Sequence, residues 1–168
     1  ECNLKDMREV LFAVRQTAML HRLFRNVCHK EEWNLKSMVS PPLYEAMERH
    51  NREFKKARAF IRGKRKKSEF ELCVIASYDE FYQQAAEAKE GMEALFLKEG
   101  KTLMEQYHVC HGDLDQHHLL MGDTYVAVTE FSRMHLGLQV EDLYHFLRKV
   151  MEKNDWDRAL GRAMLEAY

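Results

Sequence analysis

The sequence predicts a mainly helical protein that carries a small β-hairpin insertion. Three observations support this fold class. Apolar residues recur at three- and four-residue steps over most of the chain, which is the period of an α-helix. Only two prolines and seven glycines occur among the 168 residues, and both residue types interrupt helices. Short runs of β-type residues are concentrated in one segment, residues 107–128.

The periodic segments predict five helices, at residues 4–25, about 43–61, 70–99, about 140–153, and after Asn154 and Asp155. Asn3 is the expected N-cap of the first helix, and Gly100 is placed to end the third. His21 falls on the apolar stripe of the first helix, where we expect a packed, hydrogen-bonded histidine. A polar stretch at residues 29–42, which contains Trp33, interrupts the helical pattern.

The last helix is expected to place its apolar side chains, Trp156, Leu160 and Leu165, on one side. The β-type runs lie at residues 107–111, 119–121 and 125–128. Gly122 and Asp123 separate the last two runs and suit a hairpin turn. We expect a loop over residues 129–139. A hairpin presented by a helical body is a favourable place for a functional site.

Composition excludes several classes of protein. Charged residues make up 32% of the chain and nearly cancel, to a formal net charge of −1, so neither nucleic acid nor a membrane is an expected partner. The four cysteines are far apart, which favours reduced thiols in a cytosolic protein over a zinc ribbon or a disulfide framework. The chain starts without an initiator Met or signal-peptide features, which suggests that it begins inside a longer protein.

One basic run, "RGKRKKSE" at residues 62–69, has two interpretations. It could be a patch that binds anions or nucleic acid, or a solvated loop between two helices. Nucleic-acid surfaces usually combine basic residues with aromatic ones. The run contains no aromatic residue, so we favour the loop.

The stretch "HGDLDQHH" has the spacing of a phosphotransfer loop. Kinase-type loops follow the pattern H-x-D-x-x-x-x-N, in which Asp orients the attacking hydroxyl and Asn holds magnesium. Here His111 and Asp113 fill the first two positions and His118 the last. A second metal-binding carboxylate belongs to a D-F-G-type turn beyond the next hairpin, where Glu130 precedes Phe131. The predicted catalytic residues are therefore Asp113 and His111, and the predicted metal positions are His118 and Glu130.

The motif "HGD", with Gly112 where protein kinases have Arg, resembles the aminoglycoside phosphotransferase and choline kinase superfamily. Three longer segments resemble the CotS spore-coat protein family within it: "ECNLKDMREVLFAVRQTAMLHRL", "VCHGDLDQHHLL" and "VEDLYHFLRKVMEKNDWD". The resemblance extends over residues 1–168, and the last of these segments is the most specific.

The resemblance implies a single domain over residues 1–168, which forms the C-terminal lobe of the protein-kinase-like (aminoglycoside phosphotransferase) fold. The N-terminal nucleotide-binding lobe of such proteins is absent from this chain. The resemblance also implies that His111 supports the loop by packing near Phe131, and that Asp142 braces the loop backbone from the next helix. It further implies a location in the mother-cell cytoplasm and the spore coat, with other coat proteins as partners.

The chain departs from the family at both metal positions, where His118 replaces Asn and Glu130 replaces Asp. Magnesium prefers oxygen ligands, whereas imidazole suits zinc, copper or nickel. Glutamate keeps the carboxylate but moves its oxygens by about one bond length, and a shift of about 1 Å can cost on the order of 100-fold in rate. We therefore expect a kinase-fold protein with degenerate phosphotransfer that acts in coat assembly.

Two alternatives stay open. The first is an active small-molecule phosphotransferase that uses ATP and magnesium, with its N-terminal lobe outside this chain. The second is a transition-metal-binding domain, in which Asp113, His118 and Glu130 converge on one ion. The spacing of the histidines and of Cys110 fits no zinc pattern, and Cys110 is expected to be a buried small hydrophobe.

Overall fold

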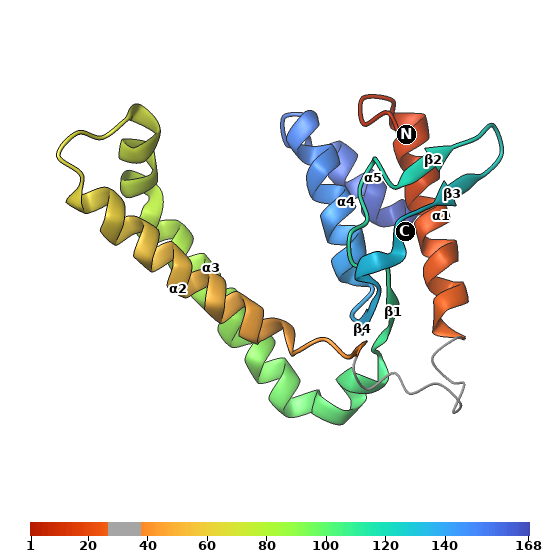
Figure 1. Cartoon of the computed structure of the whole chain (residues 1–168), viewed down its shortest axis with the longest axis horizontal. Helices are drawn as coiled ribbons and strands as arrows, with labels where there is room; N and C mark the ends of the chain where they lie inside the picture. The colour runs from red at the N-terminus through yellow and green to blue at the C-terminus, as the bar shows by residue number, and fades with distance from the viewer. Residues whose placement is uncertain (27–37) are drawn as a thin grey trace. The chain divides into compact units, whose positions relative to one another are not determined.

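The computed structural model describes residues 1–26 and 38–168, except the side chains of residues 101–104. Most of the predicted break at residues 29–42, including Trp33, lies outside the described residues. The chain divides into two compact units, Glu1–Val39 with Gln106–Tyr168, and Ser40–Glu105. Figure 1 shows the elements of both units, and each unit is considered separately below. Whether the two units form one domain, as predicted, stays a prediction.

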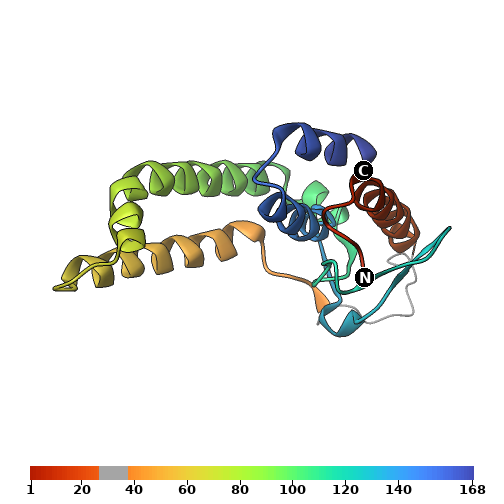
Figure 2. The ribbon, with the colours of Figure 1, turned by 90° about the horizontal axis from the view of Figure 1, so that it is seen from above.

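Three helices enclose the core of the first unit: α1 (Met7–Arg25), α4 (Val140–Lys153) and α5 (Arg158–Ala167). They lie against one another in both views (Figures 1 and 2). Each helix contributes an apolar stripe to one cluster of buried residues, which includes Val10, Val14, Phe146, Val150, Leu160 and Met164. The boundaries predicted for α4 are confirmed.

Two short antiparallel strand pairs complete this unit. β2 (Leu119–Met121) pairs with β3 (Val126–Val128), which confirms the predicted hairpin. β1 (His108–Cys110) pairs with β4 (His135–Gly137), and a 3₁₀ turn, η2 (Phe131–Arg133), precedes β4. The prediction of a loop over residues 129–139 was therefore wrong. The partner of β4 lies far back in the sequence, and a three-residue strand has too few residues to show a local period.

The helix caps differ from the prediction. Asp6, and not Asn3, caps α1, because its carboxylate accepts from the backbone N–H groups of Arg8 and Glu9. Asp157 caps α5 in the same way. Asn154, which was expected to start that helix, instead ends α4 and donates from Nδ2 to the carbonyls of Leu4 and Val150. Side-chain oxygens at several nearby positions can cap a helix, so the sequence offered more than one candidate.

The second unit is a helical hairpin of α2 (Leu43–Gly63) and α3 (Glu69–Glu105). The predicted α2 and the predicted loop in the basic run are confirmed, since residues 64–68 connect the two helices. The prediction that Gly100 ends α3 was wrong, because the helix continues to Glu105. A glycine inside a helix costs only about 1 kcal/mol relative to alanine. Within the described residues, no helix has the length and apolar character needed to cross a membrane.

Aromatic side chains join the two helices of the hairpin. The ring of Phe54 lies 4.6 Å from that of Tyr78, and the ring of Tyr44 lies 5.5 Å from that of Phe96, measured between centroids. Asn51 adds a hydrogen bond from Nδ2 to the carbonyl of Ala85. These contacts are distributed along both helices and fix their register.

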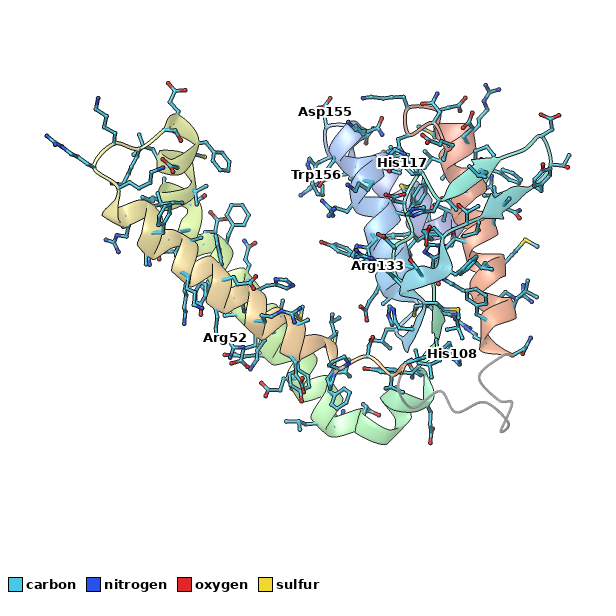
Figure 3. All side chains as sticks on the ribbon, viewed as in Figure 1. Arg52, His108, His117, Arg133, Asp155 and Trp156 are labelled. Carbon is cyan, nitrogen blue, oxygen red and sulfur yellow. The ribbon has the colours of Figure 1, made fainter. Side chains whose placement is uncertain are left out.

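The prediction that Trp156, Leu160 and Leu165 share one side of α5 was wrong. Leu160 is 6% exposed, whereas Leu165 is 60% and Trp156 59% exposed. Trp156 lies in the turn before α5 (Figure 3) and has a positive φ of 57°, so the helical period does not extend to it. Met164, four residues after Leu160, is the second buried side chain of the helix.

This difference in burial predicts different costs for two equal truncations. Leu160→Ala should lower the free energy of unfolding by about 2–5 kcal/mol, because it opens a cavity in the core. Leu165→Ala should change it by less than about 0.5 kcal/mol, because that side chain is mostly solvated. Urea denaturation of both variants measures the difference, and equal losses would contradict the packing of α5.

Candidate functional site

The loop that follows β1 passes very close to the segment between η2 and β4. Gly112 has a φ of +84°, which side chains disfavour, and a Cβ atom there would lie 2.1 Å from the carbonyl oxygen of Arg133. Such a contact is far inside van der Waals distance. Only glycine therefore allows the loop of His111 and Asp113 to lie against the turn that carries Glu130.

Asp142, in the first turn of α4, holds this loop by its backbone. Its side chain is fully buried. Oδ2 accepts from the N–H of His111 at 2.6 Å, and Oδ1 accepts from the N–H of Gly112 at 2.8 Å. His21 Nε2 lies 3.2 Å from Oδ2. The contacts are those expected of a residue that braces the loop backbone.

The electrostatics of Asp142 follow from these contacts. Burial by itself would raise the pKa of this carboxyl, since it disfavours the charged form. The hydrogen bonds from His21 and from the N–H groups of Gly112 and His111 outweigh burial, so the pKa lies below its usual range. Asp142 is therefore a charged, buried anchor whose neighbours stabilise the carboxylate.

His21 extends this anchor to the end of the described chain. It is 1% exposed, and its Nδ1 lies 2.7 Å from the hydroxyl of Tyr168. The expectation of a packed, hydrogen-bonded histidine is confirmed. Gln139 fixes the same region, because its Nε2 donates to the carbonyls of His21 and Val109 at 3.0 Å each. α1, β1 and α4 thus meet around Asp142.

His111 links the loop to the turn beyond the hairpin. Its Nδ1 accepts from the N–H of Asp113 at 3.3 Å, and its Nε2 lies 2.8 Å from the carbonyl of Thr129. A carbonyl can only accept, so the proton is on Nε2. The ring is buried and packs on Phe131, with centroids 4.8 Å apart. Both ring nitrogens are used inside the protein, so His111 positions the loop.

His118 folds back onto the loop that it ends. Its Nδ1 lies 2.6 Å from the carbonyl oxygen of Asp113 and 3.3 Å from Oδ1 of Asp115. Because both neighbours are acceptors, Nδ1 carries the proton. The imidazole thus closes the loop between Asp113 and His118 as a hydrogen-bond donor. Its Nε2 is then the ring nitrogen with a lone pair available to a metal ion.

Asp113 and Glu130 present their carboxylates at the surface. Asp113 is 45% exposed at its side chain and lies 3.5 Å from Nε of Arg133, a residue of η2 labelled in Figure 3. Glu130 has a φ of 64° and a ψ of 66°, a left-handed conformation that is uncommon outside glycine. Hydrogen bonds from Ser132, and then the nearby His118 and His111, lower the pKa of Glu130 against a smaller opposing effect of burial.

The predicted site residues are thus neighbours, although they do not form a preassembled metal site. The rings of His111 and His118 lie 5.7 Å apart. Among the described residues, no three His, Cys, Asp or Glu side chains are close enough to hold one metal ion. Cys110 is fully buried, in agreement with its predicted role as a small hydrophobe. The arrangement provides an exposed carboxylate on a rigid loop, with a second carboxylate and an imidazole beside it.

The sequence did not single out two residues that shape this site. Arg133 pairs with Asp113, and Gln139 ties His21 to Val109. Arg133 follows the predicted metal turn by a few positions, and this proximity in sequence was the available signal. Gln139 offered no signal, because its partners come from distant segments.

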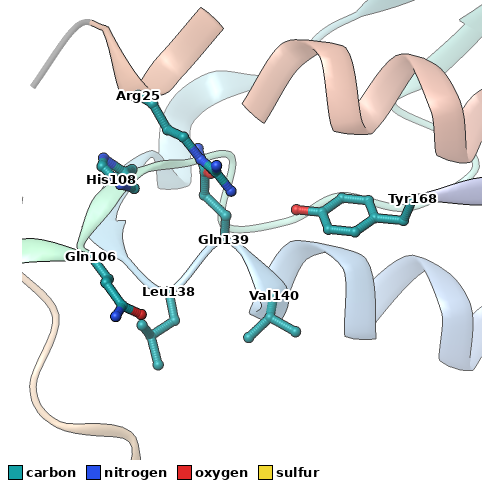
Figure 4. A pocket seen from close by; sticks show the side chains of 7 residues that line it. All are labelled: Arg25, Gln106, His108, Leu138, Gln139, Val140 and Tyr168. Atoms are coloured by element: carbon teal, nitrogen blue, oxygen red, sulfur yellow. The ribbon is translucent and has the colours of Figure 1, made fainter. Parts of the chain in front are cut away.

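A cavity of about 350 Å³ lies next to Gln139. Its lining residues, drawn in Figure 4, are Arg25, Gln106, His108, Leu138, Gln139, Val140 and Tyr168. Arg25 Nε donates to Oε1 of Gln139 at 3.3 Å, which closes one wall. None of the predicted catalytic or metal residues lines this cavity. The cavity and the surface site around Asp113 are therefore separate features.

Comparisons with known proteins agree with a kinase-like fold. No family model matches the chain, and no curated protein matches it. The chain is similar to the crystal structure of an aminoglycoside phosphotransferase from Alicyclobacillus acidocaldarius, with a TM-score of 0.73 and 20% sequence identity. The match covers 99% of this chain and 48% of that chain, so the present chain spans about half of its length. At this identity the likeness shows the fold: the chain has the fold of part of an aminoglycoside phosphotransferase.

The contact between Gly112 and Arg133 predicts a severe cost for a small change. Gly112→Ala should lower the free energy of unfolding by about 3 kcal/mol or more, because it adds both a positive-φ penalty and a backbone clash. Gly91→Ala is the control, since nothing lies within 4 Å of its added Cβ. That change, inside α3, should stabilise by about 0.5–1 kcal/mol. Chemical denaturation of both variants compares them, and a neutral Gly112→Ala would refute the close approach.

The lowered pKa of Asp142 predicts how stability depends on pH. The carboxylate stabilises the fold above its unfolded pKa, near 3.8. This stabilisation is lost as pH falls through the lower folded pKa. Asp142→Asn should therefore cost about 3–5 kcal/mol at neutral pH, because the loop N–H groups and His21 lose the buried charge. The cost should shrink as pH falls below about 3.8 and through the lower folded pKa. Denaturation curves at several pH values test this, and a pH-independent cost would contradict it.

Proposed function

We propose that this chain is the C-terminal lobe of a kinase-fold protein of the CotS spore-coat type, in which phosphotransfer is impaired. Its role is to bind other coat proteins during coat assembly, in the mother-cell cytoplasm and the spore coat. The main observation in support of impaired phosphotransfer is the hydrogen bond from His118 to the carbonyl of Asp113. The residue at the expected metal position thus serves to close its own loop.

The chemistry of the ligands supports impairment. Magnesium requires oxygen ligands in near-octahedral geometry, and His118 can offer only its Nε2. Arg133, 3.5 Å from the carboxylate of Asp113, adds a positive charge where an attacking hydroxyl would have to approach. Glu130 keeps a carboxylate, but its side chain accepts from Ser132. Each change weakens the positioning on which phosphotransfer depends.

The structural role is supported by the parts that are kept. Asp142, His111 and Gly112 retain the contacts that hold the loop, while the metal positions differ from the family pattern. A chain that keeps these loop contacts but differs at the metal positions fits a protein that functions by binding partners at its surface. The assignment to the spore coat rests on the sequence resemblance of the first helix, of the loop and of residues 140–157.

An active phosphotransferase is the second candidate, and the exposure of Asp113 on a braced loop favours it. In that case Asp113 would act as the base. Glu130 and Nε2 of His118 would lie beside the magnesium ion, which together with ATP would complete the site. The nucleotide-binding lobe would have to come from a part of the protein outside this chain.

Thermal shift measurements with ATP and magnesium separate these two candidates. The natural full-length protein should show a shift of less than about 1 °C, because a ligand that does not bind the native state cannot stabilise it. A large magnesium-dependent rise in Tm would show that the protein binds ATP and magnesium, and it would contradict the structural role.

The double change His118→Asn with Glu130→Asp serves as the control. It restores the oxygen ligands of the family pattern while leaving the loop contacts of Asp142 in place. If ATP and magnesium stabilise this variant but not the natural protein, the cleft is intact and the two substitutions account for the loss.

A further inference from the structure

A groove between α2 and α3 lies in the second compact unit. Its volume is about 380 Å³, and its lining residues are Lys55, Arg58, Ala59 and Arg62 of α2 with Tyr78, Asp79 and Tyr82 of α3. Three of these side chains are cationic and one is anionic. The groove therefore carries an excess of positive charge within a protein whose net charge is close to zero.

Two stacked tyrosines line this groove. The rings of Tyr78 and Tyr82 are nearly parallel, with centroids 5.4 Å apart. The guanidinium of Arg58 lies 4.2 Å from the centre of the Tyr78 ring, and Nζ of Lys55 lies 4.8 Å from that of Tyr82. Cation–π contacts of this kind hold the two charges in place. The cations are therefore positioned before any ligand arrives.

The positive charge is only partly neutralised within the unit. Asp79 lies 2.9 Å from Arg58, but its own side chain is 80% exposed. Nε of Arg58 is buried and has no hydrogen-bond partner. Among the described residues, no acidic side chain forms an ion pair with Lys55 or Arg62. Lys55 and Arg62 are exposed, so their positive charge is open to an acidic ligand.

The cations follow one line along α2. Lys55, Arg58 and Arg62 are three and four residues apart, so they lie on one face of the helix. Their rise along the axis is about 4.5 and 6 Å. Side chains on one face of an extended segment repeat at about 6.6–6.8 Å, which flexible cationic side chains can match.

We propose that this groove is a docking site for an extended acidic segment of a partner protein, whose carboxylates pair with Lys55, Arg58 and Arg62. The inference goes beyond the proposed function, since it uses no property of the loop around Asp113. If the proposed function of the site around Asp113 proved wrong, the proposal of a docking groove would not be affected.

The tyrosines favour an acidic polypeptide over a nucleic acid. Single-stranded nucleic acids bind by stacking bases on open aromatic faces. Here Tyr78 is 3% exposed, and each ring has one face toward the other tyrosine and a cation over it. No open ring face remains on Tyr78 for a base. The groove thus offers charge without a stacking platform.

Charge reversal on two faces of the same helix tests the proposal. The test variant is Lys55→Glu with Arg62→Glu, which leaves Arg58 and the tyrosine stack intact. The matched control is Lys56→Glu with Arg49→Glu, which makes the same change in net charge about 100–120° around the helix. Both control residues are exposed. Circular dichroism of both variants should show unchanged helix content.

The probe is a short fluorescent peptide that alternates Glu with Ser, and the complete protein is titrated by anisotropy. We expect this peptide to bind more tightly than one that alternates Gln with Ser, and more weakly at high salt. Kd should rise about tenfold or more in the test variant and less than about twofold in the control.

Three results would overturn the proposal. Equal loss in the two double variants, or no preference for Glu over Gln, would show that the groove is not the binding surface. Tighter binding of a single-stranded oligonucleotide that the test variant abolishes would reassign the groove to nucleic acid.

Discussion

The buried carboxylate of Asp142 is the interaction on which the site depends. Removing a charge from water costs several kcal/mol, and the cost is offset only where donors surround the charge. Two loop N–H groups and His21 supply these donors. Asp142 also lies in the first turn of α4, where the helix dipole favours a negative charge. One side chain thereby joins α1, α4 and the loop after β1, three segments that are distant in the sequence.

A second constraint holds the loop after β1 against the turn at Glu130. Gly112 lies against the backbone of Arg133, and His111 reaches Thr129 across the hairpin. Neither contact uses the carboxylate of Glu130 or Nε2 of His118. The frame can therefore persist while the metal positions change, because stability and phosphotransfer depend on different atoms. This separation is consistent with the proposal that the loop is retained while its phosphotransfer chemistry is impaired.

The sequence predicted those parts of the fold that have a local cause. The boundaries of α4 and the hairpin of β2 and β3 follow from periodicity and turn residues, and they are present. β4 was missed because its pairing with β1 is long-range. In the candidate site, motif spacing predicted Asp113 and His118, and the structure places them at the two ends of one loop. The hydrogen bond of His118 to its own loop depends on a side-chain rotamer, and spacing carries no information about rotamers.

Net charge also carries no information about how charges are distributed over the surface. A formal charge of −1 is a sum over the whole chain, whereas a ligand meets only one surface. Lys55 and Arg58 precede the basic run and form no linear motif with it. The period of α2 aligns them with Arg62, and α3 supplies the aromatic side chains that the basic run lacks. A nearly neutral sequence is thus compatible with a basic groove. Folding brings cationic residues from different positions in the sequence onto one surface.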